Sequence, residues 1–249
     1  MSTLTERFDT VCERLEKALV RSGRTRDSLE LVAVSKTHPA ASVAELAAYW
    51  SRTGRGRTQF GENYVQEALE KMPQVATLLA ARADECLPAW HFIGHLQSRK
   101  SKDIIGCFSL IHSLDSLKTA QTLQKAWDNE TDETQKKPQD VLIQVNIGHE
   151  AQKSGVEPEE LEDLLNKTQA LPGVRVRGLM CLPPLAEIGE QSRPYFIMLA
   201  ALRTKMEKLC GLDLPCLSMG MSGDFECAVE EGATLVRIGT DIFGTRVYP

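Results

Sequence analysis

Short apolar runs alternate with longer segments of helical periodicity along almost the whole chain. The first run covers 29–36, where the β-branched residues Val32 and Val34 precede a His-Pro pair at 38–39. This length and composition, followed by a proline, are typical of a buried strand. Comparable runs predict seven further strands. The expected strands cover 29–36, 58–60, 89–94, 108–115, 141–147, 174–182, 216–222 and 235–239.

The segments between these runs carry apolar residues at intervals of three and four. Thr3 and Glu6 have capping-box spacing, and apolar residues follow at helical intervals, which predicts an amphipathic helix over 3–22. The polar run 128–139 is typical of a solvated loop. Further helices are expected over 43–50, from Tyr64 onward, near Ser98, and over 117–127, 159–171, 195–209 and 224–231.

This order of elements indicates the fold class. Eight strand–helix units after one N-terminal helix predict an α/β fold, a single (β/α)8 TIM-like barrel. The units use the whole chain, so we expect one domain over 1–249, with no second domain after it. A doubly wound sheet is the alternative.

Composition agrees with such a barrel and excludes several function classes. Of the 249 residues, 42% are hydrophobic and 25% charged, as in ordinary globular proteins. The net charge of −5 and the lack of a basic block argue against nucleic-acid binding. Neither a signal peptide nor a run of membrane-spanning length is present. The seven cysteines contain no C-x-x-C pair, which indicates reduced thiols and a cytoplasmic location.

Polar residues and glycines gather where the predicted strands end. In (β/α)8 barrels the carboxyl ends of the strands carry the chemistry, so this placement predicts a site there. Lys36 closes an apolar strand, where a charged amine is costly unless it reaches solvent, pairs with an anion or loses its charge in a bond. Arg237 lies within an apolar strand, where solvation alone does not explain a charged residue. The other strand-end positions are Asn63, Gly94, His95, Asp115, Asn146, 218–222, Gly239 and Thr240.

The last two strands supply a candidate anion site. Residues 218–224 contain two glycines and lead into a predicted helix, and Gly239-Thr240 follows the eighth strand. Backbone amides and hydroxyls from these two loops suit a phosphate group, which barrels of this kind often bind here. A lysine at one end and a phosphate site at the other predict pyridoxal 5'-phosphate (PLP), whose aldehyde condenses with an amine. Arg237 would then face its pyridine nitrogen.

Six motifs strengthen this hypothesis. They are LVAVSK (31–36), FGENYVQE (60–67), WHFIGHLQ (90–97), GLM (178–180), SMGMS (218–222) and VRIG (236–239). In these motifs the chain resembles the pyridoxal 5'-phosphate homeostasis protein family, which is similar to the barrel domain of alanine racemase, a type III PLP fold. The resemblance implies that Lys36 holds the cofactor as a Schiff base and that Arg237 meets the pyridine nitrogen. It also implies Ser222, Gly239 and Thr240 as phosphate ligands, with Ser218 and Asn63 lining the pocket.

Two classes of function remain at this stage. An amino-acid racemase needs a base on each face of its substrate, and the one tyrosine near a strand end, Tyr64, is expected to pack where its helix begins. The resemblance implies instead a protein that buffers or delivers PLP inside the cell, with PLP-dependent apoenzymes or free amino acids as partners. We therefore expect no catalytic residue and no substantial turnover.

Metal and thiol chemistry are weaker alternatives. His91 and His95 are four residues apart but have no helix and no acidic neighbour, so packed histidines are favoured over a zinc site. Cys181 and Cys227 lie near strand ends, but no motif places a base beside them.

Overall fold

The computed structural model confirms the predicted barrel. It describes residues 2–82, 87–96, 104–131, 136–150, 152–184 and 188–245. Eight strands close into a barrel in the order β1 to β8, and each strand pairs in parallel with its neighbours. The strands are β1 (Glu30–Val34), β2 (Gln59–Glu62), β3 (Ala89–Phe92), β4 (Leu110–Leu114), β5 (Gln139–Val145), β6 (Val174–Cys181), β7 (Cys216–Ser218) and β8 (Leu235–Ile238).

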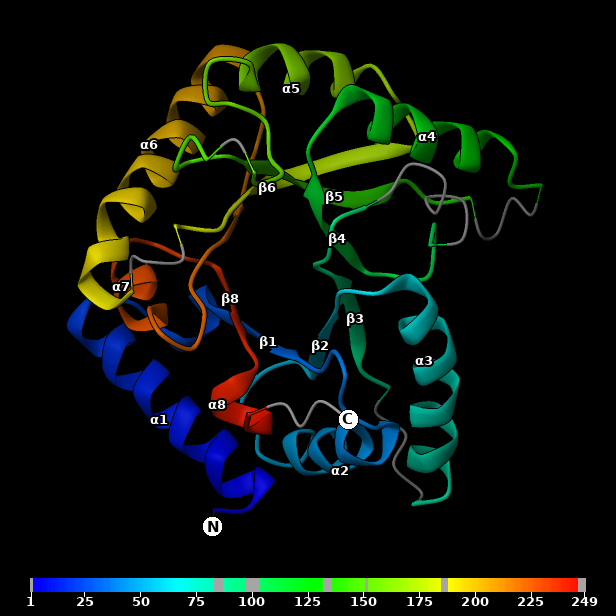
Figure 1. Ribbon diagram of the computed structural model, residues 1–249, viewed down its shortest axis with the longest axis vertical. Helices are drawn as coiled ribbons and strands as arrows, with labels where there is room; N and C mark the ends of the chain where they lie inside the picture. Colours follow the sequence, from blue (N-terminus) through cyan, green and yellow to red (C-terminus); the bar gives the residue numbers. More distant parts are fainter. Residues whose placement is uncertain are drawn as a thin grey trace.

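Helices surround the strands as a ring (Figure 1). The Thr3–Glu6 capping box forms as predicted at the first helix. The helical piece expected near Ser98 lies outside the described residues. The helices are α1 (Leu4–Arg21), α2 (Ala40–Trp50), α3 (Val65–Ala80), α4 (Leu117–Asp128), α5 (Leu161–Gln169), α6 (Arg193–Cys210), α7 (Phe225–Glu230) and α8 (Thr240–Phe243).

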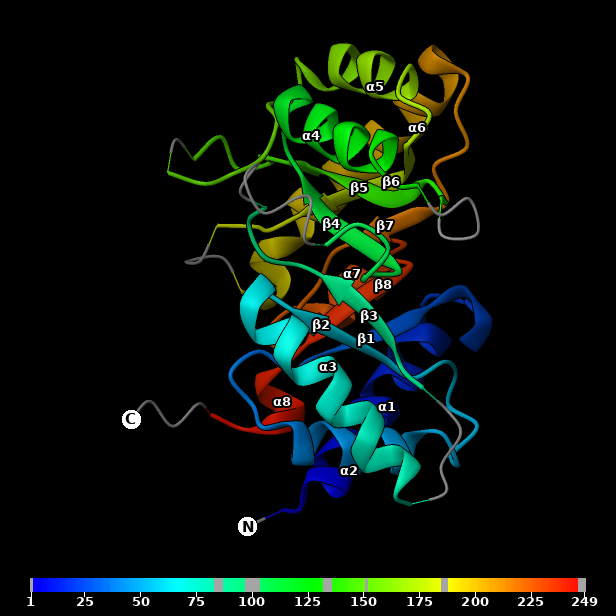
Figure 2. The same ribbon diagram turned by 90° about the vertical axis from the view of Figure 1, so that its right-hand side faces the viewer.

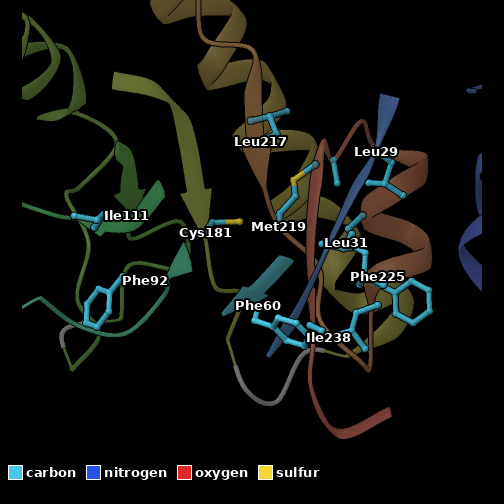
Figure 3. Close-up of a cluster of buried hydrophobic side chains, with 14 of the residues drawn as sticks. Leu29, Leu31, Phe60, Phe92, Ile111, Cys181, Leu217, Met219, Phe225 and Ile238 are labelled. Atoms are coloured by element: carbon cyan, nitrogen blue, oxygen red, sulfur yellow. The ribbon is translucent and has the colours of Figure 1, made fainter. Parts of the chain in front are cut away.

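Apolar side chains form two regions of core. The larger one fills the layer between the strands and the helices, where Phe60, Phe92, Leu217 and Phe225 are buried (Figure 3). A smaller one lies inside the barrel and consists of Val32, Leu110, Leu142, Met180 and Leu235. Successive strand residues face opposite sides of a sheet, so Arg237, two residues after Leu235, also points into the barrel.

Two elements differ from the sequence-based expectation. The seventh strand was expected over 216–222 but ends at Ser218, because Gly220 takes a left-handed φ of 92° and begins a loop. The four-residue helix α8 directly after β8 was not predicted. Both differences lie at the ends of the last two strands and shape the site described below. Among the described residues, no helix is long and apolar enough to span a membrane.

Candidate functional site

A cavity of about 520 Å³ opens at the carboxyl ends of the strands, a size typical of small-molecule sites. Six of the seven residues predicted for the site line it, which brings together positions from β1, β2, β7 and β8. Those six are Lys36, Asn63, Ser222, Arg237, Gly239 and Thr240. Ser218 is the exception, because the structure places it behind Arg237 and outside the described lining.

Lys36 lies two residues beyond β1, and its neighbours on both sides are firmly held. Ser35 is fully buried, and its hydroxyl donates to Glu62 Oε1 at 2.7 Å. Thr37 takes a left-handed φ of 65°, and its amide donates to Glu67 Oε1 at 2.6 Å. A threonine rarely adopts this backbone conformation, so the turn after Lys36 is set by its surroundings.

Lys71 of α3 connects these contacts. Its amine donates to Glu62 Oε1 (2.8 Å), Glu67 Oε1 (2.6 Å) and the Ser35 carbonyl (2.8 Å). Glu62 is 0% and Lys71 6% exposed, so the pair is buried between the barrel wall and α3. Burial raises the pKa of Glu62, while Lys71 and Ser35 act in the opposite direction. This buried network fixes the backbone from which Lys36 enters the cavity.

Arg237 is another cationic residue that lines the cavity, and it is only 4% exposed. Its Nη1 donates to Ser218 Oγ at 2.5 Å and its Nη2 to the Cys181 carbonyl at 3.0 Å. Burial lowers the pKa of Arg237, but a guanidinium remains charged at ordinary pH. In the described part of the chain it forms no ion pair, which leaves its charge directed at whatever fills the cavity.

Two histidines extend the support of Arg237 into the barrel. Ser218 Oγ lies 2.8 Å from His112 Nδ1, and His112 Nε2 lies 2.9 Å from His91 Nδ1. Burial lowers the pKa of His91 to about 3 and that of His112 well below its usual value. Both rings are therefore neutral at physiological pH, and His91 is the packed histidine that the sequence favoured over a zinc ligand.

The loops after β7 and β8 line the end of the cavity where the sequence predicts an anion, which is called the anion end below. Neither the Ser222 amide nor the Gly223 amide donates to another described residue. Asp224 shapes their loop, because its carboxylate accepts from the Met221 amide at 2.6 Å and from Ser192 Oγ at 3.0 Å. Gly239 lies so close to Val34 that an added Cβ would meet it at 3.3 Å. Unbonded amides beside a hydroxyl are the groups with which proteins bind oxyanions.

Asn63 presents the clearest unsatisfied group of the site. Its Oδ1 is buried and has no hydrogen-bond partner in the structure. The end of β3 approaches closely here, since a Cβ on Gly94 would lie 2.0 Å from the Asn63 carbonyl oxygen. Only glycine fits that position, and a buried unpaired amide oxygen is costly unless a ligand or water satisfies it.

The lining also includes residues that sequence reasoning did not assign. Gly94 and His95 were recognised as polar strand ends, and both line the cavity, whereas Asp115 and Asn146 do not. The same strand-end rule also covers Leu182 and Pro183, directly after β6, but not Lys153 and Ser154, which lie well beyond the end of β5 at Val145. The unassigned residues are Val34, His38, Ile93, Gln144, Lys153, Ser154, Leu182, Pro183 and Gly244.

The alternative chemistries gain no support from the geometry. Burial raises the thiol pKa of Cys181 and of Cys227 to about 12, so both are protonated at neutral pH. Tyr64 does not pack as expected, because it is 56% exposed, and it is absent from the described lining. The prediction of a packed tyrosine is wrong, since Tyr64 is the N-cap residue of α3 and more than half of it is exposed.

Comparison with known proteins gives consistent matches over the full length. The family model of the alanine racemase N-terminal domain matches residues 6–247. The pyridoxal phosphate homeostasis protein of Aquifex aeolicus is 45% identical over 98% of both chains, and that of Pseudomonas aeruginosa is 43% identical over 100% of this chain and 98% of its own. The structure of PipY from Synechococcus elongatus with PLP bound is 33% identical, with a TM-score of 0.73 over 94% of this chain and 100% of PipY.

Proposed function

This chain belongs to the family of the alanine racemase N-terminal domain and, within it, to the pyridoxal phosphate homeostasis proteins, and we propose that it binds PLP in the strand-end cavity. Its role is intracellular PLP homeostasis, by buffering the cofactor or delivering it. The observation that carries this proposal is one cavity that joins a lysine, a buried guanidinium and unbonded backbone amides.

The residues of this chain fit the cofactor. PLP supplies an aldehyde that condenses with amines and a ring that accepts electron density. The unpartnered Asn63 Oδ1 and the unbonded amides of Ser222 and Gly223 are polar groups that a ligand of mixed polarity would satisfy. Arg237 adds a fixed positive charge in the same space. An apolar ligand would leave all of these groups unsatisfied.

Lys36 is the proposed covalent attachment point. Its amine attacks the aldehyde carbon, and loss of one water molecule leaves a C=N bond. The network of Glu62, Glu67 and Lys71 holds the backbone on both sides of Lys36. Lys71 itself donates to three oxygens, so its amine is not available for the same reaction.

Ser222, Gly239 and Thr240 are the proposed phosphate ligands. They come from two loops that meet at one end of the cavity, and the Ser222 hydroxyl already accepts from the Asp241 amide at 3.4 Å. A phosphate carries up to two charges and several acceptor oxygens, which suits unbonded amides and hydroxyls. Ser218 contributes indirectly, because it holds Arg237.

Arg237 also supports a carrier rather than an enzyme. A guanidinium only donates hydrogen bonds, so a pyridine nitrogen that faces Arg237 stays unprotonated and withdraws electrons weakly. Racemisation further requires a base on the second face, and Tyr64 is 56% exposed and absent from the described lining of the cavity. We propose that the protein has no substantial turnover of amino acids, and that free amino acids or PLP-dependent apoenzymes receive the cofactor.

The proposal is tested on purified protein by absorption spectroscopy, borohydride reduction and peptide mapping. We expect a Schiff-base band that disappears in Lys36→Ala and a reduced cofactor attached to Lys36. Attachment to another lysine would refute the assignment. Incubating the loaded protein with amino acids in deuterated water tests the second part. Exchange of the α-proton at typical enzyme rates of roughly 1 per second or faster would establish an enzyme instead.

A further inference from the structure

Helix α1 has no strand of its own in the barrel, yet it packs against the two helices that follow the anion-binding loops. It contacts α7 and α8 more extensively than α2, and the two views show α8 at the same end of the molecule as α1 (Figures 1 and 2). Ser222 and Gly223 are separated from α7 only by its N-cap residue Asp224, and Gly239 immediately precedes α8. A contact from α1 to both helices therefore influences the positions of both loops.

Arg14 of α1 makes that double contact. Its Nε lies 2.7 Å from Glu226 Oε1 on α7, and its Nη1 lies 2.6 Å from Asp241 Oδ2 on α8. The guanidinium also lies 4.4 Å from the centre of the Phe225 ring, which fixes its position on α7. Arg14 is absent from the described lining of the cavity, so any effect on a ligand passes through the loops.

Helix α8 depends on such contacts. A helix of four residues has too few internal hydrogen bonds to be stable alone. Arg7, also on α1, donates to the carbonyls of Ile242 (2.7 Å) and Phe243 (3.3 Å) at the end of α8. The Asp241 amide in turn donates to Ser222 Oγ, which joins α8 to the loop after β7.

The charges explain why an arginine is needed between the helices. Glu226 and Asp241 bond the same guanidinium, so without it two carboxylates would face each other and repel. Their separation would move the loop of Ser222 away from that of Gly239. Both carboxylates also lie close in sequence to the anion-binding loops, where an uncompensated negative charge opposes a phosphate.

We propose that Arg14 is a positioning residue that holds the two loops at the spacing that a phosphate group requires. This inference rests on the proposed function, because the ligand whose phosphate is held is PLP. It assigns the extra N-terminal helix a role in ligand selectivity. Arg14 affects ligands that carry a phosphate and leaves the lysine end of the cavity unchanged.

The test compares three ligands on Arg14→Met and wild type: PLP, pyridoxal and inorganic phosphate. The Arg14 side chain is 37% exposed, so each ion pair is partly screened, and we expect a loss of about fivefold to tenfold in affinity for PLP and phosphate. Affinity for pyridoxal should change less than about twofold. Fluorescence titration serves for the first two ligands and phosphorus NMR for inorganic phosphate.

Arg21→Met is the matched control. Arg21 is also on α1 and lies 2.7 Å from Glu230 on α7, but it makes no contact with α8 in the described structure. The Arg21→Met variant should leave the affinities for PLP, pyridoxal and inorganic phosphate unchanged. An equal effect of the two variants, or an equal loss for PLP and pyridoxal in Arg14→Met, would overturn the proposal and leave Arg14 a purely structural residue.

Two further measurements keep the test decisive. Arg14→Lys retains the charge but not the two-sided geometry, so we expect an intermediate loss for PLP even if Arg14→Met fails to fold. An unchanged PLP-to-pyridoxal ratio in Arg14→Lys would count against the proposal. If the wild-type protein bound phosphate but formed no bond to PLP, the proposed function would fail. An affinity for inorganic phosphate that depends on Arg14 would still support the positioning role of Arg14.

Discussion

The two ends of the cavity are built on different principles. At the lysine end, the support consists of buried charges, with Glu62 at 0% and Lys71 at 6% exposure. At the anion end, the support consists of loops with glycines, the buried Asp224 and a partly exposed arginine on a neighbouring helix. The lysine end is thus held by the folded core, whereas the position of the loops at the anion end depends on contacts near the surface.

This difference predicts different consequences of substitution. Breaking a buried ion pair leaves an uncompensated charge in the core and lowers the free energy of unfolding. Removing a group from the loops changes the affinity for a phosphate-bearing ligand but leaves most of the core intact. The lysine end is therefore tested by measurements of stability, and the anion end by measurements of binding.

The largest effect is expected for Lys71→Met without ligand. The substitution leaves Glu62 buried without its cation, so we expect a loss of roughly 3–5 kcal/mol in the free energy of unfolding. Urea denaturation measures it. Lys167→Met is the control, because Lys167 forms an exposed ion pair with Asp163 at 2.6 Å and should lose less than about 0.5 kcal/mol. Similar losses in both variants would remove the proposed distinction between core and surface support.

The second effect concerns the histidines behind Arg237. Burial lowers the pKa of His91 from 6.5 to about 3, so between these values the unfolded state binds a proton that the folded state does not. The free energy of unfolding therefore falls as the pH drops below about 6.5, by roughly 2 kcal/mol for His91 at a pH of about 5. Urea midpoints across this range measure the change.

His91→Asn isolates that contribution. Burial raises the pKa of Glu62 and Asp224, so these carboxyl groups contribute in the opposite direction, with stability gained as the pH falls. They are present in both proteins, so the difference between wild type and His91→Asn belongs to His91 and to its effect on His112, whose pKa it also lowers. A pH dependence that is identical in the two proteins would show that His91 is not buried and neutral in the native state.

The third effect tests the anion end directly. Ser222→Ala removes a hydroxyl beside the unbonded amides, and we expect a loss of about 1.5 kcal/mol, roughly tenfold, in affinity for PLP. The urea midpoint and the affinity for pyridoxal should remain close to wild type. A large fall in stability would instead place Ser222 among the residues that hold the fold together.

The smallest effect is expected for Glu67→Gln. The amide oxygen still accepts from Thr37, but the charge opposite Lys71 is lost, so we expect about 0.5–1 kcal/mol less stability. The rate at which PLP reacts with Lys36 should fall together with the stability, because the turn at Thr37 is held less firmly. Glu70→Gln on the exposed face of the same helix is the control, and an equal change in rate would contradict a positioning role for Glu67.

Sequence reasoning was most successful where a local pattern determines position. The alternation of apolar runs and helical segments predicted the eight strands of the barrel and their parallel order. Because the strands are parallel, their carboxyl ends meet at one face, so Lys36, Asn63 and Arg237 could be placed together before the structure was known. The identity of the cofactor relied in addition on the resemblance between motifs.

Only the tertiary structure decided which side chains reach the cavity and which ones support it. Ser218 closes β7 and Arg237 lies one residue before the end of β8, yet the packing inside the barrel puts the serine behind the arginine. The contact between Arg14 and Asp241 joins residues 227 positions apart, a separation that no periodicity encodes. The physical reason is that hydrophobic patterning depends on local burial, whereas ion pairs and hydrogen bonds depend on angles and distances that exist only when the barrel has closed.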